Sequence, residues 1–181
     1  MSTDRNSLLE LLRTNSVRTG DFVLASGRRS SYYVDARRTT MSGRGQLLIG
    51  RLGLAAIDEA GWRPAAVGGL TLGADPVAYA IAHAAAAAGR GLDAFTVRKE
   101  AKAHGAGRQV EGPVEPGTAV VVVEDVVTSG GSALRAIDAL TAFGARVVGV
   151  LAVVDREEGG RASIEAAGHA LVSLFRVSEL T

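Results

Sequence analysis

The sequence contains no cysteine among its 181 residues. This absence excludes disulfide bonds, thiolate zinc sites, iron–sulfur clusters and cysteine nucleophiles. A large excess of one sign of charge is also missing, because 20 lysines and arginines stand against 19 aspartates and glutamates, a net charge of +1. Proteins whose main work is to coat nucleic acid or anionic membrane need a large basic surplus, so that class is excluded. We predict no nucleic-acid partner.

Long apolar runs are missing as well. The longest uncharged apolar stretch, near residues 84–88, is mostly alanine and is far too short to span a bilayer. Residues 1–13 include Asp4 and Glu10 and lack the uninterrupted apolar core of a signal peptide. We therefore expect a soluble, cytoplasmic protein with no membrane partner. Because the length is close to that of one domain, we expect residues 1–181 to form a single domain.

Strand-like and helix-like apolar spacing alternates along most of the chain, which predicts an α/β fold with a mainly parallel central sheet flanked by helices. The valine-rich stretch 118–123 is typical of a strand buried on both faces of such a sheet. Residues 98–113 are too polar and irregular for a strand or helix and are predicted to be a long loop. We predict helices over 7–12, 42–60, 75–88, 132–143 and 164–167, and strands over 65–68, 92–97, 118–123, 146–154 and 170–175, with a short strand pair within 17–34.

Several helix ends are predicted from capping residues. Ser42 and Ser132 are expected as N-caps, and Asp75 is expected to cap a helix whose first residue is Pro76. In the helix that starts at Ser42, we expect the leucines, including Leu47, to face the core.

Two adjacent carboxylates, Glu124 and Asp125, follow the valine strand, and a turn rich in hydroxyl groups and glycine leads from them into the next helix. Backbone N–H groups of such a turn, helped by the positive end of the helix, can bind a monophosphate. Because carboxylates facing a phosphate would repel it, they are better suited to accept hydrogen bonds from sugar hydroxyls. The pattern indicates a phosphorylated sugar. An ordinary strand–turn–helix connection with two solvated acids is the alternative.

The stretch 120–132 resembles the phosphoribosyl pyrophosphate signature of type I phosphoribosyltransferases, with Glu-Asp where many members have Asp-Asp. The resemblance implies that family's fold. It also implies that the 5-phosphate lies on the turn, that the ribose diol lies on the two carboxylates, and that Asp125 is catalytic. The residues expected to bind phosphoribosyl pyrophosphate here are Glu124, Asp125, Val126, Val127, Thr128, Ser129, Gly130, Gly131 and Ser132.

The only two lysines of the chain, Lys99 and Lys102, lie in the predicted long loop, whereas the other 18 basic residues are all arginines. Lysine is a compact and mobile point charge. A mobile cationic loop could close over a pyrophosphate and neutralise its charge as it leaves. A solvated basic loop is the alternative, and the neighbouring phosphosugar pattern favours the lid.

Three segments resemble orotate phosphoribosyltransferases in particular. The stretch 98–105, together with 110–112, is similar to their catalytic loop. The stretch 26–35, which includes Tyr32 and Tyr33, is similar to part of their small N-terminal hood, so we expect residues about 1–40 to form a hood over the base. The stretch 154–156 resembles the strand end at which members hold the orotate carboxylate.

This second resemblance implies Mg2+-dependent transfer of the 5-phosphoribosyl group from phosphoribosyl pyrophosphate to orotate, giving orotidine 5′-monophosphate and pyrophosphate in pyrimidine biosynthesis. Mg2+ is expected mainly on the pyrophosphate and water, with no known protein ligands. It also implies a homodimer in which loop 98–113 completes the neighbouring site. Pyrophosphate contacts are expected from Arg98, Lys99, Lys102 and His104, with Lys102 and His104 catalytic, and orotate contacts from Thr128, Arg156, Tyr32 and Tyr33.

The sequence departs from the family pattern at two positions, and the pyrophosphate or base contacts that lysines make there in the family are not assigned. Many members have lysine at the position of Ala25, and another lysine in the loop around Leu72. Backbone amides of residues 71–73 are expected to replace the second. A type I enzyme acting on another base, and a regulator that senses phosphoribosyl pyrophosphate without catalysis, are the alternative functions.

Overall fold

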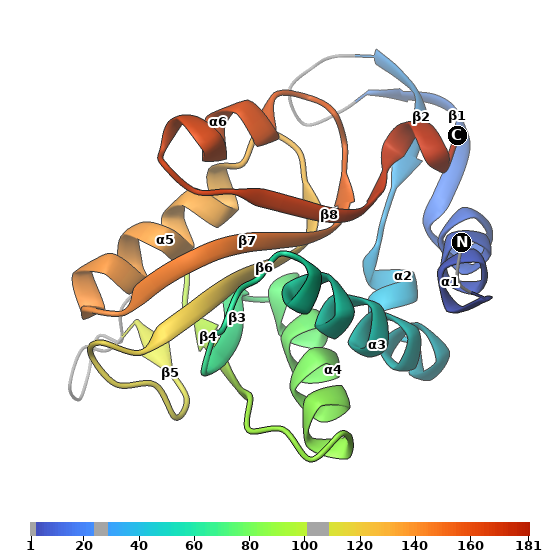
Figure 1. The fold of residues 1–181 in the computed structure, drawn as a ribbon. Helices are drawn as coiled ribbons and strands as arrows, with labels where there is room; N and C mark the ends of the chain where they lie inside the picture. Colours follow the sequence, from blue (N-terminus) through green and yellow to red (C-terminus); the bar gives the residue numbers. More distant parts are fainter. Residues whose placement is uncertain (1–2, 24–28, 101–108) are drawn as a thin grey trace.

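Six strands form the central sheet in the order β5-β4-β3-β6-β7-β8, and all except β5 run parallel (Figure 1). The computed structural model describes residues 3–23, 29–100 and 109–181. The strands of this sheet are β3 (Ala66–Leu70), β4 (Asp93–Val97), β5 (Val110–Glu111), β6 (Ala119–Val127), β7 (Arg146–Asp155) and β8 (Leu171–Arg176). The predicted α/β fold with a mainly parallel sheet is confirmed.

Helices cover both faces of the sheet (Figure 1). The helices of the chain are α1 (Thr3–Ser16), α2 (Arg37–Thr40), α3 (Gly43–Glu59), α4 (Ala74–Ala87), α5 (Gly131–Phe143) and α6 (Gly160–Ala166), with a final 3-10 turn η1 (Val177–Glu179). In β6, Val121 and Val123 face the layer with α1, α3 and α4, whereas Val120 and Val122 face the layer with α5 and α6. All four valines are fully buried, as expected for a strand between two helical layers.

The N-terminal segment forms the predicted strand pair. Strands β1 (Val17–Val23) and β2 (Arg29–Val34) are antiparallel, with Val17 opposite Val34. The backbone N–H of Asp35 donates to Ser16 O at 2.9 Å and closes the base of the hairpin. The hairpin lies beyond the carboxyl ends of β7 and β8, in the position expected of a hood (Figure 1).

The C-terminal residues tie this segment to the sheet. Arg5 of α1 contacts the Glu179 carboxylate at 2.5 Å and stacks on the ring of Phe175 in β8, 4.6 Å from its centroid. Arg13 donates to the backbone oxygen of Glu179 at 2.6 Å. Helix α1 is therefore attached to β8 and the C-terminal turn, in addition to the β1–β2 hairpin that follows it.

Two predicted strand and loop boundaries were wrong. Strand β6 continues through Glu124 and Asp125 to Val127, because backbone pairing with β7 extends to Val127 opposite Asp155. The predicted loop 98–113 contains β5, which pairs with the end of β4. A two-residue strand leaves too short a pattern to identify from sequence.

Three expectations about helices were also wrong. Helix α4 starts after Gly73 and α5 after Gly130, so Asp75 and Ser132 lie inside the first turn rather than at the caps. Leu47 is 54% exposed, although the other leucines of its helix are buried or half-buried. The predicted cap of α3 is confirmed, since the Ser42 hydroxyl accepts from Gly45 N at 3.1 Å. Within the described residues, no helix has the length and apolarity needed to cross a membrane.

Candidate active site

The carboxyl ends of four neighbouring strands carry most of the predicted site. Because β4, β3, β6 and β7 are parallel neighbours, their ends meet at one edge of the sheet. The segments that follow the strands or complete their ends there are Arg98–Lys99 after β4, Thr71–Gly73 after β3, Glu124–Ser132 at the end of β6, and Asp155–Glu158 at the end of β7.

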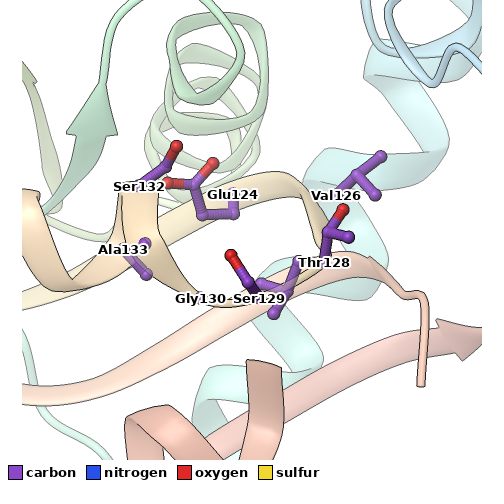
Figure 2. A pocket seen from close by; sticks show the side chains of 9 residues that line it. Glu124, Val126, Thr128, Ser129, Gly130, Ser132 and Ala133 are labelled. Carbon is purple, nitrogen blue, oxygen red and sulfur yellow. The ribbon is translucent and has the colours of Figure 1, made fainter. Parts of the chain in front are cut away.

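The turn after β6 encloses a cavity of about 90 Å³. Gly130 has a φ of 84°, a left-handed conformation that favours glycine and lets the turn enter α5. The backbone N–H groups there and the positive end of a 13-residue helix suit an anion the size of a phosphate. Figure 2 shows the residues that line the cavity, which are Glu124, Val126, Val127, Thr128, Ser129, Gly130, Gly131, Ser132 and Ala133.

Glu124 lies in the wall of this cavity, with its side chain directed toward the start of α5 (Figure 2). It is only 4% exposed, and its Oε1 has no hydrogen-bond partner in the described part of the chain. Burial, and secondarily the neighbouring Asp125 charge, raise the pKa of Glu124 to about 8. The side chain is therefore mainly protonated at neutral pH, so it would not repel a phosphate beside it, whereas the prediction from sequence assumed a charged carboxylate.

Asp125 points to the other side of the strand, toward the loop after β3. Its Oδ1 accepts from the Val126 N–H at 2.8 Å, and Arg37, which is paired with Asp35 at 2.9 Å, lies close enough to act on its charge. Burial raises the pKa of Asp125, and the Val126 N–H and Arg37 oppose that rise. The two carboxyl groups thus occupy different environments, and the contribution of Arg37 had no signal in the sequence.

The Glu124 carboxyl group gives a pH-dependent stability. Its pKa is raised from 4.5 in the unfolded chain to about 8 when folded, so the folded protein binds this proton more tightly. The free energy of unfolding therefore falls as pH rises through that window. We expect Glu124→Gln to be more stable than the parent by about 2–4 kcal/mol at pH 8.5, and nearly equal at pH 4.5.

Urea unfolding of parent and variant at a series of pH values measures this difference. Glu165→Gln, an exposed change in α6, serves as the control. A difference between Glu124→Gln and the parent that stays constant from pH 5 to pH 9 would contradict the assigned ionisation.

The loop Thr71–Gly73 packs against Asp125. A Cβ added at Gly73 would lie 2.6 Å from Asp125 Oδ1, so only glycine allows this approach. Leu72 is 56% exposed and occupies the region in which lysine was expected. The donors that the loop can offer an anion are therefore the backbone N–H groups of Leu72 and Gly73, because the Thr71 N–H donates to Val97 O at 2.9 Å and the Thr71 hydroxyl donates to Asp75.

Arg156 begins the turn after β7 and is buried, with 8% of its surface exposed. Its guanidinium lies over the ring of Tyr32, 5.5 Å from the centroid, and its Nη2 is 2.7 Å from Glu158 Oε1. Its Nε has no hydrogen-bond partner among the described residues. A buried guanidinium with a donor to spare, beside an aromatic ring, suits a planar anion.

Tyr33, unlike Tyr32, does not lie beside Arg156. Because successive side chains of a strand point to opposite faces, Tyr33 turns away from the Tyr32 side, and its ring lies 5.8 Å from that of Phe22. Its 40% exposure leaves Tyr33 available only from the outer face of the hairpin.

The predicted cationic loop begins at this edge of the sheet. The N–H of Arg98 donates to Gln109 O at 2.8 Å, and the Gln109 side chain returns a hydrogen bond to Arg98 O at 2.9 Å, which closes the two ends of the loop on each other. Arg98 and Lys99 are exposed. Lys102 and His104 lie outside the described residues, as does the position of Ala25.

A glycine of α6 supports the turn formed by residues 128–132, which we call the phosphate turn, and this glycine was not among the site residues predicted from the sequence. A Cβ at Gly160 would lie 2.6 Å from Thr128 O and 3.0 Å from Gly130 N. The pair Gly159-Gly160 was visible in the sequence, but which backbone it approaches depends on the packing of α6 against β6.

Known proteins resemble this chain over almost its whole length. Residues 45–167 match the phosphoribosyl transferase domain. The orotate phosphoribosyltransferase of Aquifex aeolicus is 48% identical over 180 residues, 98% of this chain and 97% of that protein. That of Mycobacterium tuberculosis H37Rv is 50% identical over 177 residues, 98% of this chain and 96% of that protein. A crystal structure of the M. tuberculosis protein with 5-phospho-alpha-D-ribosyl 1-diphosphate superposes with a TM-score of 0.84, at 46% identity and 98% coverage of both chains.

Proposed function

This chain belongs to the phosphoribosyltransferase family, and we propose that it is an orotate phosphoribosyltransferase, which transfers the 5-phosphoribosyl group from phosphoribosyl pyrophosphate to orotate. The products are orotidine 5′-monophosphate and pyrophosphate, and the step belongs to pyrimidine biosynthesis. The observation that carries the proposal is the placement of Arg156 on Tyr32, one strand away from the phosphate turn. An anion-binding turn and a site for a flat anion thus lie at neighbouring strand ends.

Phosphoribosyl pyrophosphate would lie across these strand ends. The 5-phosphate occupies the turn that begins at Thr128, and the ribose diol lies at Glu124 and Asp125. Because the Thr71–Gly73 loop contacts Asp125 on the side away from the turn, it would face the pyrophosphate at C1. Lys99 is two residues beyond the end of β4, the strand next to β3, and would neutralise the leaving group. Lys102 and His104 remain predicted contacts in the same loop.

In the reaction, the bond between ribose C1 and the pyrophosphate oxygen breaks, and its electron pair leaves with pyrophosphate. A new bond forms between C1 and the ring nitrogen of orotate, which is anionic because its N–H proton has been released to water. Arg156 would hold the orotate carboxylate, and Thr128 would contact the ring. Positive charge that develops on the ribose is tolerated beside Asp125. No covalent intermediate with the protein is required, so positioning does most of the work.

Mg2+ would enter with the substrate. The described residues contain no cluster of three or more side chains able to ligate a metal, which is compatible with an ion held mainly by pyrophosphate and water. Bound in that way, Mg2+ supplies positive charge to the departing pyrophosphate. Asp125, a hard oxygen donor beside the loop Thr71–Gly73, is the residue best placed to meet its water shell.

We also propose a homodimer, formed through the outer face of α3 and α4. This face has two exposed apolar side chains, Leu47 and Tyr79, which are 54% and 52% exposed. A groove of about 420 Å³ beside Leu47 is lined also by Arg51 and His83. Tyr79 contacts Thr96 near the end of β4, so a second copy seated here would lie next to the origin of loop 98–113. Such a copy could receive that loop in its own site.

The dimer proposal predicts the effect of a charge on this face. Leu47→Arg would place a second cation beside Arg51 in the same groove and, by symmetry, in both copies. We expect the parent to sediment at twice the 18.6 kDa of the chain, and the variant at the mass of one chain. Asp138→Lys in α5, on the opposite layer, is the control. A parent that is monomeric at micromolar concentration would contradict the proposal.

Base turnover tests the proposed activity directly. Purified protein is mixed with phosphoribosyl pyrophosphate, Mg2+ and one base at a time, and consumption of the base is followed. We expect orotate to be consumed, and uracil, adenine and hypoxanthine to be left unchanged. Turnover of one of those bases without orotate would indicate a different transferase, and no turnover with any base would indicate a regulator.

A further inference from the structure

We propose that Asp75 is a positioning residue that fixes the loop Thr71–Gly73 for the pyrophosphate group. This inference rests on the proposed function for the identity of the ligand. Its structural basis is a hydrogen-bonded cluster at the ends of β3 and β4, apart from the phosphate turn and from Arg156.

Both oxygens of Asp75 are engaged by threonines from two different strand ends. The Thr71 hydroxyl donates to Oδ2 at 2.7 Å, and the Thr96 hydroxyl donates to Oδ1 at 2.9 Å. The Tyr79 hydroxyl lies 3.2 Å from Thr96 Oγ1 and extends the cluster by one turn of α4. A single carboxylate therefore joins the first turn of α4 to the end of β4 and to the first residue of the loop.

This use of the carboxylate differs from helix capping. Asp75 lies at the second position of α4, where an aspartate commonly accepts from free N–H groups of the first turn. Within the described residues, no side chain caps α4, and the Asp75 hydrogen bonds that the structure gives go to the two threonines. The side chain is thus directed at the loop and the neighbouring strand instead of its own helix.

The loop Thr71–Gly73 needs to be held in a fixed position because it has no lysine. No lysine is present at residues 71–73, and the Thr71 N–H donates to Val97 O at 2.9 Å, so a pyrophosphate would be bound mainly by the backbone N–H groups of Leu72 and Gly73. A lysine can move its charge to the ligand, whereas a backbone donor acts only where the loop places it. Gly73 packs against Asp125 on one side, and Asp75 holds Thr71 on the other. The two contacts fix both ends of the three-residue loop.

The hydroxyl donors also reduce the electrostatic cost of a carboxylate near pyrophosphate. Asp75 is half-buried and accepts one hydroxyl hydrogen bond at each oxygen. Its negative charge is therefore directed at the threonines and away from the open face of the loop. A positioning role, with no contact to the ligand, follows from this geometry.

Calorimetric binding of pyrophosphate and of ribose 5-phosphate, with Mg2+ present, tests the proposal, together with steady-state kinetics. We expect Asp75→Ala to weaken pyrophosphate binding about tenfold and to raise the KM for phosphoribosyl pyrophosphate by a similar factor. Ribose 5-phosphate, which reaches only the phosphate turn and the diol site, should keep its affinity within about twofold. The KM for orotate should also stay within about twofold.

Two further variants separate positioning from a general structural role. Asp75→Asn keeps an acceptor for one threonine and is expected to restore most of the pyrophosphate affinity. Thr71→Val removes one hydrogen bond, leaves the Asp75–Thr96 bond in place, and is expected to weaken pyrophosphate binding in the same direction as Asp75→Ala. Asp93→Asn, at the exposed opposite end of β4, is the matched control and should behave as the parent.

The proposal is overturned if pyrophosphate binding is unchanged in both Asp75→Ala and Thr71→Val, or if ribose 5-phosphate is weakened as much as pyrophosphate. If Asp75→Ala does not fold, Thr71→Val alone decides by the same criteria. These affinities do not depend on the base. A parent protein that binds pyrophosphate without converting orotate would refute the proposed function and leave this comparison valid.

Discussion

Replacing Arg156 with alanine is expected to raise the KM for orotate about 100-fold, because a buried, charge-assisted contact with the orotate carboxylate is lost. The guanidinium is 8% exposed and is placed over Tyr32, so no other cation in this turn can take its position. Arg156→Lys keeps the charge but loses the planar fork, and we expect it to recover only part of the loss. Initial rates at varied orotate and saturating phosphoribosyl pyrophosphate measure the effect.

The KM for phosphoribosyl pyrophosphate provides the internal control, since the phosphate turn follows β6, not β7, and should be unaffected. Arg146→Ala, at the exposed start of the same strand β7, is the matched variant and should behave as the parent. If Arg156→Ala raised both KM values equally, Arg156 would have a general structural role, and its assignment to the base site would be wrong.

Gly160→Ala is expected to weaken binding of phosphoribosyl pyrophosphate by about tenfold or more, although Gly160 has no predicted contact with the ligand. The added methyl group would lie 2.5 Å from Val127 Cγ1 and 2.6 Å from Thr128 O, so the backbone of the phosphate turn must move away from α6. We also expect the free energy of unfolding to fall by about 1–3 kcal/mol, as for other overpacked sites. Binding calorimetry with ribose 5-phosphate and urea unfolding measure the two effects.

Gly91→Ala is the control for this substitution, because a Cβ at Gly91 would meet nothing within 4 Å. Ribose 5-phosphate is the appropriate ligand, since it tests the turn without the pyrophosphate loop. An affinity of Gly160→Ala equal to that of the parent, at a lowered stability, would show that the turn can shift without harm to the phosphate site.

The sheet was predictable from sequence because its signal is local. Four consecutive valines at 120–123 fit only a strand covered on both faces, and the structure places alternate valines in the two core layers. The exact ends were less predictable, since β6 continues through Glu124 and Asp125. Polar residues at a strand end can pair their backbone as well as valine does, and pairing with β7 is a property of the sheet rather than of the segment.

The candidate site was predictable where neighbouring residues in the sequence are also neighbours in space. The turn 128–132 is such a case, because a single continuous segment forms the cavity wall. The role of Asp75 was not predictable, because its partners Thr71 and Thr96 belong to different strands. Asp-Pro at the start of a helix is the usual pattern of a cap, and local sequence could not reveal that the carboxylate turns toward the strand ends.

The orientation of Tyr32 and Tyr33 was also not predictable from the sequence. The sequence pattern gave both tyrosines the same role, although adjacent residues of a strand must face opposite sides. Which of the two faces inward depends on the register of the hairpin, set by pairs such as Val17 with Val34. The structure places Tyr32 beneath Arg156.

The division of the site between β6 and β7 has a consequence for how this enzyme could evolve. The sugar phosphate is assigned to residues at the ends of β3 and β6, whereas the base is assigned to Arg156 of the β7 turn and to Tyr32 of the hairpin. Apart from Thr128, which is assigned to both the sugar phosphate and the base, a change of preferred base therefore needs substitutions mainly in the second group. The ancestral chemistry at ribose C1 can persist while the choice of acceptor diverges, and directed evolution toward a new base should begin at these two positions.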